Sequence, residues 1–346
     1  GQIVNVDADT DGNGAGTFTL AVTKSLNTNN AVLSITAADI QIQGTTTSGT
    51  AVTNIHTTNQ RTIGVGTTTE DMDIEANEVQ QMTAVGLTIG KAVTNKNIKV
   101  VGMGAAASNT ITQVVSLLAV VDDSQVVFDT TPSTFFSLAA QADNGVVVKA
   151  DVTTTEESMY LDGDFEDSSS QDGLNTVGFT DGRVVTAKTV LTIEASKGTM
   201  IPSGKLTMNA GTGVTLLDNL LGEAAGKPLV INADYEDHGD GTLTVWTGKT
   251  VTSNNNVITV TAWDIDMDGS MTSGSAATNL HGSKTDQTIG LGAASKDMHI
   301  DANEIVSLVS ALVIGNDNNG SITVNAASFT SVSLIATRDE IGRAHV

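Results

Sequence analysis

Carboxylates alternate with other residues near the N-terminus, in a pattern that is typical of calcium loops. Asp7, Asp9 and Asp11 precede Gly12 and Asn13, so alternate side chains could converge on one hard cation around a glycine bend. Phe18 stands where such a loop carries its bidentate glutamate, which leaves the ligand set incomplete. We therefore predict an acidic turn, with Asp7, Asp9 and Asp11 as candidate calcium ligands, and expect no other cofactor.

Two histidines, His56 and His281, occupy equivalent places in two similar segments of the chain. Neither stands beside a serine or cysteine nucleophile with a fixed partner, and no histidine group has the spacing of a zinc site. A polysaccharide lyase or hydrolase would also need basic groups beside its carboxylates. Before residue 340, arginine occurs only at Arg61, Arg183 and Arg338. We therefore predict turn-capping imidazoles and expect that the protein is not an enzyme.

Asp264, Asp266 and Asp268 form a second alternating set, with Ile265 and Met267 between them. Alternation with a period of two predicts a strand whose carboxylates face solvent and whose aliphatic side chains face a core. In the equivalent segment of the first half only one carboxylate remains, since the positions are Asp39, Gln41 and Gln43. This drift favours a solvated strand face over a metal site.

The chain contains a long internal duplication, and the candidate residues lie on the elements that it repeats. Residues 5–90 reappear as residues 230–315, so that Gly269 corresponds to Gly44 (269 − 44 = 225). Glycines, asparagines and alternating aliphatic residues are shared, whereas exposed polar residues differ. Because the scaffold is kept more strictly than any candidate site, the duplication indicates a structural array.

A shorter period lies inside the duplication. Aliphatic segments end on glycine at intervals of about 23 residues, at Gly44, Gly66 and Gly90 and again at Gly269, Gly292 and Gly315. A period of two nested in this longer period predicts a β-solenoid, because each coil supplies short strands that pair with the coils above and below. We expect an all-β, right-handed parallel β-helix with coils of about 23 residues. Two short segments, 76–82 and 302–308, have some helical character, but we interpret them as bent strands or connectors.

Composition excludes several classes of function. A net charge of −23, from 39 acidic and 16 basic residues, repels nucleic acid and anionic lipid. Cysteine is absent, and aromatic residues make up only 3% of the chain, so the core must be built from small aliphatic side chains. No apolar run reaches the roughly 20 residues of a membrane span, so we predict no membrane insertion.

The last residues have an unusual sequence. Residues 341–346, Ile-Gly-Arg-Ala-His-Val, are the translation of a common sequencing adapter, and Glu340 fits its preceding bases. We therefore expect residues 340–346 not to be native, and predict a single continuous β-solenoid over residues 1–339.

A resemblance covers most of the chain. The segments INADYEDHGDGTLTVWTGKTVTSNNN (231–256), TAWDIDMDGS (261–270) and HGSKTDQTIGLGAASKDMHI (281–300) resemble repeats of very large uncharacterised proteins of unicellular marine algae. The likeness extends through VVFDTTPSTF (126–135) and GFTDGRVV (178–185). In periodicity and composition the chain also resembles β-helix adhesins of the filamentous-haemagglutinin type. These resemblances imply an extracellular or cell-surface fibre and carry over no catalytic residue.

The function predicted from the sequence is a structural or adhesive segment of such a fibre, with copies of itself or neighbouring repeats as partners and possible assembly into filaments. The alternative is a carbohydrate-binding or carbohydrate-cleaving β-helix with a polysaccharide partner. The candidate sugar-binding residues are Trp246 and Trp263, which replace Ala21 and Ala38 of the first copy, because exposed tryptophan stacks on sugars. A third possibility, a string of calcium-stiffened β-sandwiches, disagrees with the spacing of the glycines.

Overall fold

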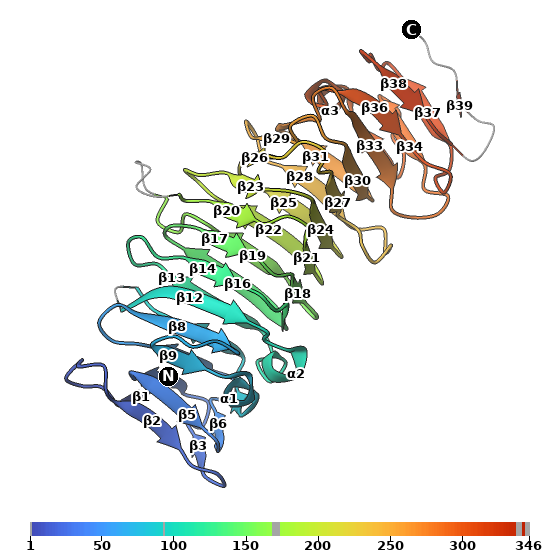
Figure 1. Ribbon diagram of the computed structural model, residues 1–346. Coiled ribbons are helices and arrows are strands. Elements are labelled where there is room, and N and C mark those ends of the chain that lie inside the picture. The colour runs from blue at the N-terminus through green and yellow to red at the C-terminus, as the bar shows by residue number, and fades with distance from the viewer. Residues whose placement is uncertain (1, 93, 168–173, 337–340, 343–346) are drawn as a thin grey trace. The chain divides into compact units, whose positions relative to one another are not determined.

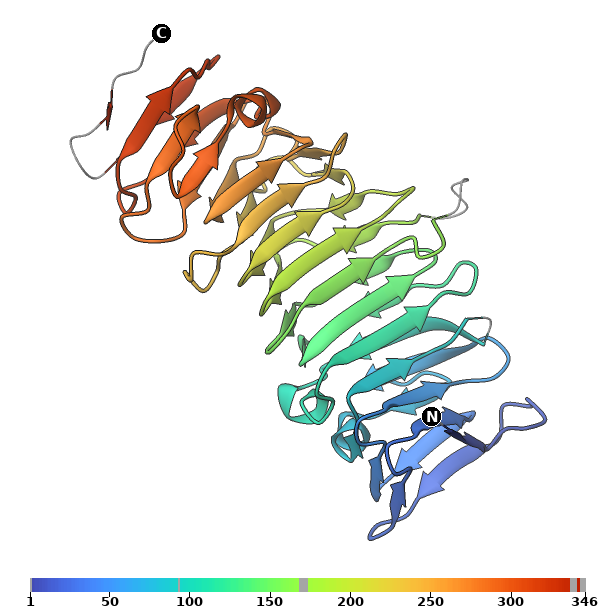
Figure 2. The same cartoon turned by 180° about the vertical axis from the view of Figure 1, so that it is seen from behind.

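A computed structural model of the chain describes residues 2–92, 94–167, 174–336 and 341–342. The chain divides into two compact units: unit 1 is Gly1–Gly178 with Ala195–Gly198, and unit 2 is Phe179–Glu194 with Thr199–Val346. Figures 1 and 2 show from opposite sides that each unit consists of stacked short strands with a few short helices at their edges.

Unit 1 contains two long parallel sheets. The first has the strand order β1 (Ile3–Asp7), β4 (Val32–Thr36), β7 (Val52–His56), β11 (Gly86–Ile89), β13 (Val114–Ala119), β16 (Ser137–Ala142) and β19 (Met159–Asp162). The second has the order β9 (Met72–Ile74), β8 (Arg61–Gly66), β12 (Asn95–Val101), β14 (Val126–Phe128) and β17 (Val146–Val148). Strand β20 (Val177–Phe179) spans the boundary between the units.

Shorter sheets complete unit 1. They pair β2 (Thr17–Leu20) with β5 (Asp39–Ile42), β6 (Thr45–Thr47) with β3 (Ser25–Asn27) and β10 (Met82–Thr83), and β15 (Ser133–Phe135) with β18 (Val152–Thr154). Its helices are α1 (Ala76–Gln80) and α2 (Ala105–Ser108).

Unit 2 is built in the same way. One sheet has the order β21 (Arg183–Ala187), β24 (Leu206–Ala210), β27 (Leu229–Asn232), β30 (Ile258–Ala262), β33 (Ala277–Gly282), β36 (Ala311–Ile314) and β38 (Val332–Leu334). A second has β22 (Val190–Glu194), β25 (Gly213–Leu216), β28 (Thr242–Val245) and β31 (Asp264–Met267). A third has β23 (Met200–Pro202), β26 (Leu220–Leu221), β29 (Thr250–Thr252) and β32 (Ser270–Thr272). The last has β35 (Met298–Ile300), β34 (Ile289–Gly292), β37 (Ile322–Asn325) and β39 (Ile341–Gly342), and the helix is α3 (Ala302–Ser307).

Consecutive strands lie in different sheets, and each strand pairs in parallel with a strand of the next coil. For example, β13, β14 and β15 belong to three sheets, and their next partners are β16, β17 and β18. This arrangement is a parallel β-solenoid, which confirms the all-β fold predicted from the nested periods.

Regular coils have about the predicted length or slightly less, as from Val126 to Val146 (146 − 126 = 20), and coils that carry an insertion are longer. Val115 pairs with Leu138 (138 − 115 = 23), whereas Thr53 pairs with Leu87 (87 − 53 = 34), because this second coil also contains α1. The glycines that suggested the period end strands of three different sheets, since Gly44 follows β5, Gly66 ends β8 and Gly90 follows β11. Their spacing therefore does not measure the step from coil to coil.

The core consists of columns of aliphatic side chains. In unit 1 one column runs through Val6, Ile35, Ile55, Ile89, Leu117, Ala140 and Leu161. In unit 2 an equivalent column runs through Val185, Met208, Ile231, Val260, Leu280, Ile314 and Leu334. The alternating aliphatic residues in the segments that end on the periodic glycines are buried, at 4% exposure or less: Ile40, Ile42, Ile63, Val65, Leu87, Ile89, Ile265, Met267, Ile289, Leu291, Leu312 and Ile314.

Asparagine corners connect the coils. Asn29 and Asn30 have positive φ angles of 54° and 63°, and the equivalent Asn254 and Asn255 have 54° and 64°. Asparagine tolerates this left-handed backbone better than most residues. The Asn30 side-chain oxygen also accepts a hydrogen bond from the Thr50 backbone N–H of the next coil, at 3.0 Å, so the corner ties adjacent coils together.

The two segments interpreted as bent strands or connectors are short helices, α1 and α3, and that interpretation was wrong. In α3, Asp301 accepts hydrogen bonds from the backbone N–H groups of Asn303 and Glu304, and Glu304 accepts one from the Asp301 N–H at 2.8 Å. This capping box satisfies the N–H groups that a short helix leaves open. The Asp-Ala-Asn-Glu spelling was the sequence signal for it.

The duplication is visible as equivalent elements: β4, β7, α1 and β11 correspond to β30, β33, α3 and β36. Whether residues 1–339 form one continuous solenoid stays a prediction. Of the residues assigned to adapter, Ile341–Gly342 form β39, and 340 and 343–346 lie outside the described residues.

Candidate functional site

The candidate calcium loop uses its carboxylates for hydrogen bonds to its own backbone. Asp7 Oδ1 accepts from the Asp9 N–H at 3.1 Å, and Asp11 accepts from the Asn13 N–H at 3.3 Å and from its side-chain amide at 2.7 Å. Asp9 is buried, at 3% exposure, and accepts from the Gly14 N–H at 3.1 Å and from the Thr58 hydroxyl. The Thr58 hydrogen bond lowers the pKa of Asp9, which keeps this carboxylate ionised.

A buried aspartate also accepts hydrogen bonds from its own loop in unit 2. Asp234, the equivalent of Asp9, is fully buried and accepts from the N–H groups of His238 and Gly239 and from the Ser283 hydroxyl, at 3.1, 2.9 and 2.5 Å. The shared role of the two loops is therefore to fix a turn. Across the described residues, no group of three or more histidine, aspartate or glutamate side chains is placed to hold a metal ion, so Asp7, Asp9 and Asp11 are not gathered as a ligand set.

Calcium is expected to stabilise the chain in a graded way, because a net charge of −23 attracts divalent cations while the loop carboxylates are already engaged. Calorimetric titration should show weak heats without a stoichiometric endpoint, and sodium chloride of equal ionic strength should raise the melting temperature less. Asp11→Ala is the informative variant, because Asp11 is exposed whereas Asp9 anchors the turn. A sharp one-to-one isotherm that Asp11→Ala abolishes would instead establish a calcium site.

A carboxylate that the sequence analysis did not single out has the more unusual environment. Glu78, in α1, is 6% exposed, and it accepts hydrogen bonds from the Ile42 N–H at 2.8 Å and the Glu75 N–H at 2.9 Å. Burial raises the pKa of Glu78 to about 7, and nearby Glu75 and Asp39 act in the same direction. This side chain joins α1 to β5 and lines an open acidic hollow with Asp39 and Asp73.

In unit 2 the equivalent glutamate joins α3 to β31 in the same way, but its neighbours differ. Glu304 accepts from the Met267 N–H at 3.1 Å and the Asp301 N–H at 2.8 Å, and burial raises its pKa. Asp264 accepts a hydrogen bond from the His299 N–H at 3.0 Å. The equivalent Asp39 of unit 1 accepts one from the Asp73 N–H at 3.2 Å. The backbone donors are kept although Asp73 is replaced by His299. The recurring Ala-Asn-Glu triplet was the signal, and it identifies a buried glutamate that joins the helix to a strand and whose pKa is raised by burial.

The two equivalent histidines lie at the ends of β7 and β33. Nε2 of His56 is 3.3 Å from the Thr36 hydroxyl, and Nδ1 of His281 is 3.5 Å from the Thr261 hydroxyl. Burial lowers the pKa of both histidines, so both rings are neutral at physiological pH. Each ring lies beside a threonine that pairs with it on the neighbouring strand, so it bridges adjacent coils, and the turn-capping role stays a prediction.

The tryptophans differ in exposure. Trp246 is 54% exposed in the turn that follows β28, whereas Trp263 is half-buried and has the Lys284 ammonium 5.9 Å from its ring centroid. Trp246 alone of the two therefore offers a free ring face of the kind that stacks on sugars.

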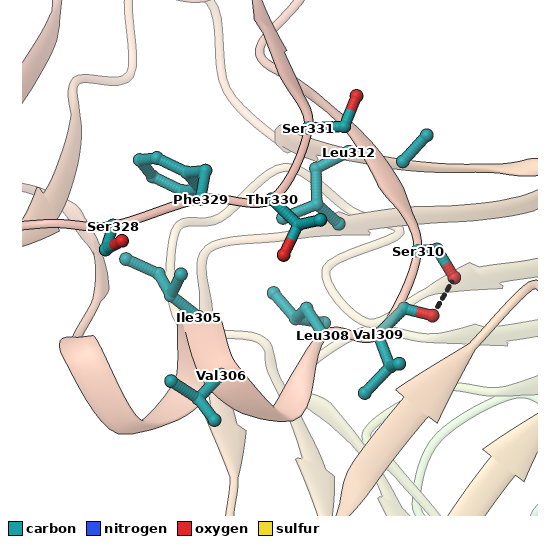
Figure 3. Close-up of a pocket in the computed structure, with 11 residues that line it drawn as sticks. Ile305, Val306, Leu308, Val309, Ser310, Leu312, Ser328, Phe329, Thr330 and Ser331 are labelled. Carbon is teal, nitrogen blue, oxygen red and sulfur yellow. Dashed lines mark hydrogen bonds between the residues drawn. The ribbon is translucent and has the colours of Figure 1, made fainter.

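An apolar hollow lies beside α3. Figure 3 shows Ile305, Leu308 and Leu312 around the space between this helix and the segment that carries Phe329. In unit 1 the equivalent helix α1 is covered by α2, and Val79 is 1% exposed. Leu312 pairs with Val332 (332 − 312 = 20), whereas Leu87 pairs with Val115 (115 − 87 = 28). The shorter coil has no counterpart of α2, which leaves the side of α3 open.

Comparison with known protein families, with curated proteins and with solved structures found no match. Among the described residues, no helix combines the length and apolar character that crossing a bilayer requires.

Proposed function

We propose that the chain is a structural segment of a long extracellular or cell-surface fibre, acting as a spacer and as an adhesive surface. The observation that carries this proposal is the selective preservation of scaffold contacts between the two copies. Asp9 and Asp234 anchor equivalent turns. Glu78 and Glu304 join equivalent helices to equivalent strands.

Exposed positions changed over the same segments. Gln41 and Gln43 of the first copy correspond to Asp266 and Asp268 of the second, and Ala21 corresponds to Trp246. A dedicated catalytic site would have constrained these side chains, whereas a spacer constrains only the coil. The likeness of residues 231–300 to repeats of large algal proteins supports the fibre context.

Antibodies raised against the isolated chain test the proposal on the cells from which the sequence comes. A surface fibre predicts filamentous labelling of intact, unfixed cells, and trypsin treatment of those cells should remove it. Labelling that appears only after permeabilisation would refute the surface location.

A second candidate function, binding of a neutral polysaccharide, is favoured by the exposed ring of Trp246. Sedimentation with insoluble glucans and chitin separates the two functions. A purely structural segment stays in the supernatant. Retention that Trp246→Ala abolishes and Trp263→Ala leaves intact would support the polysaccharide.

A further inference from the structure

Two exposed valines stand at the rim of the apolar hollow beside α3. Val306 is 76% exposed and Val309 is 59% exposed, and both line this hollow, which encloses about 510 Å³. Figure 3 places both on the α3 side of the space, with the segment that carries Phe329 on the other side. Apolar side chains that are exposed together around a pocket are typical of an interaction site.

These valines replace polar residues of the first copy. When the two Ala-Asn-Glu triplets are aligned, Val306 corresponds to Gln80 (306 − 80 = 226) and Val309 to Thr83 (309 − 83 = 226). Gln80 and Thr83 are also exposed, so both positions face solvent in unit 1 as well. Two solvent-facing positions have therefore become apolar in unit 2, a change that solubility disfavours.

The cover that α3 lacks is present in unit 1. There α2 packs on α1, and the Thr110 hydroxyl donates a hydrogen bond to the Val79 carbonyl at 3.1 Å. Ala107 and Ile111, which flank this contact, are 6% and 0% exposed. In unit 2 the corresponding residues 315–331, all of which the structure describes, contain strand β37 and no helix. The segment that covers α1 therefore has no counterpart on α3.

The loss of this cover and the gain of the valines occur at one place. In unit 1 α2 leaves Gln80 and Thr83 in solvent, which agrees with their polar character. In unit 2 the same two positions are apolar and border an open hollow. The combination indicates an occupant that fills the place of α2 and extends over the two valines.

The sequence of the α2 segment indicates the chemistry of this occupant. Residues 103–111, Met-Gly-Ala-Ala-Ala-Ser-Asn-Thr-Ile, have mostly small side chains and no charge, and they form one helical turn. None of the 11 residues that line the hollow beside α3 is charged either. Insertion of a helix with an apolar face into an apolar groove is a recurring mode of peptide recognition.

We infer that the hollow beside α3 is a docking site for a short helical segment of another polypeptide, with small, uncharged side chains like those of α2. The small side chains of this segment fill the hollow, and its flank covers Val306 and Val309. The inference goes beyond the structural function proposed above, because a plain spacer needs no such site.

Cysteine tethering tests the inference, because the chain contains no cysteine of its own. Ser328→Cys places one thiol at an exposed position that lines the hollow. The probe is a peptide with the sequence of residues 102–112, extended by one cysteine. At equilibrium with 2-mercaptoethanol, mass spectrometry should show about tenfold more disulfide-linked peptide than with a scrambled peptide of the same composition. Because the disulfide raises the effective concentration to the millimolar range, weak binding still registers.

Two variants locate the capture. In the Ser328→Cys chain, Val306→Gln with Val309→Thr restores the residues of unit 1 and should lower capture about tenfold. Both positions are exposed, so circular dichroism and the melting temperature should stay unchanged. Gln80→Cys, in a chain that keeps Ser328, is the matched control. Its thiol stands on the equivalent helix α1, which α2 already covers, and it should capture the intact and the scrambled peptide equally.

Equal capture of intact and scrambled peptide by the Ser328→Cys chain would overturn the inference, and so would capture that survives the two valine changes. Sedimentation that shows a dimer of the whole chain, lost in the Val306→Gln, Val309→Thr variant, would assign the hollow to a second copy. Binding of decanoate without capture of the peptide would assign it to an acyl chain. Either result would refute the helical partner, and neither bears on filamentous surface labelling, which tests the proposed function separately.

Discussion

Ile265→Asp is expected to destabilise unit 2 by about 4 kcal/mol or more, which is among the larger effects of a single substitution. Ile265 is 3% exposed in β31, where it pairs with Leu243 of the preceding coil. The change removes a buried aliphatic side chain and places a carboxylate in a dry core without a partner. Chemical denaturation followed by circular dichroism should show the transition of unit 2 at a much lower denaturant concentration.

Thr215→Asp is the matched control for this substitution. Thr215 lies in the same sheet on β25, but its side chain faces outward and is half-buried. The same carboxylate there should cost about 1 kcal/mol or less, because water still solvates it. If Ile265→Asp unfolds at the same denaturant concentration as the parent, the inward register of β31 is wrong.

Alternation along single strands predicted the fold class and the buried residues, because inside and outside of a strand are encoded by a period of two. Ile265 and Met267 were placed correctly on this basis. The period says nothing about which side of the coil a strand occupies. The glycines at 44, 66 and 90 therefore gave a spacing but no pairing.

The candidate site was harder to predict, because its chemistry depends on contacts between distant segments. Asp9 was recognised by its neighbours in sequence, but its hydrogen-bond partner Thr58 lies in another coil. Glu78 reads as one more acidic residue in an acidic chain, and only its contact with the distant Ile42 N–H shows that it is buried. Local composition predicted where carboxylates occur and not which of them would be desolvated.

That desolvation has a measurable consequence, a pH-dependent contribution of Glu78 to stability. The pKa of Glu78 is about 7 in the folded chain and about 4.5 when unfolded, so the folded state binds the proton more tightly. The resulting stabilisation is fully present below the unfolded value and is lost as the pH rises through 7. Since one pKa unit corresponds to about 1.4 kcal/mol, the loss between pH 6 and pH 8 should be at most about 1.4 kcal/mol. Glu304, with a raised pKa, acts in the same direction.

Other groups titrate against this trend. His56 and His281 have lowered pKa values, so the unfolded chain binds their protons more tightly and their contribution to stability rises with pH near 6.5. Asp9 and Asp71, whose pKa values are lowered by hydrogen bonds, lose their contribution only in acid. The effect of Glu78 must therefore be measured as a difference between two chains at each pH.

Glu78→Gln supplies that difference. The amide does not ionise, so the free energy of unfolding of the parent minus that of Glu78→Gln should fall by about 1 kcal/mol between pH 6 and pH 8. The histidine contributions cancel in this comparison, because both chains contain His56 and His281. A difference between the parent and Glu78→Gln that stays constant with pH would mean that water reaches this carboxylate. In that case α1 would be held to β5 by an ordinary ionised glutamate, and its hold would weaken only in acid, as the carboxylate becomes protonated.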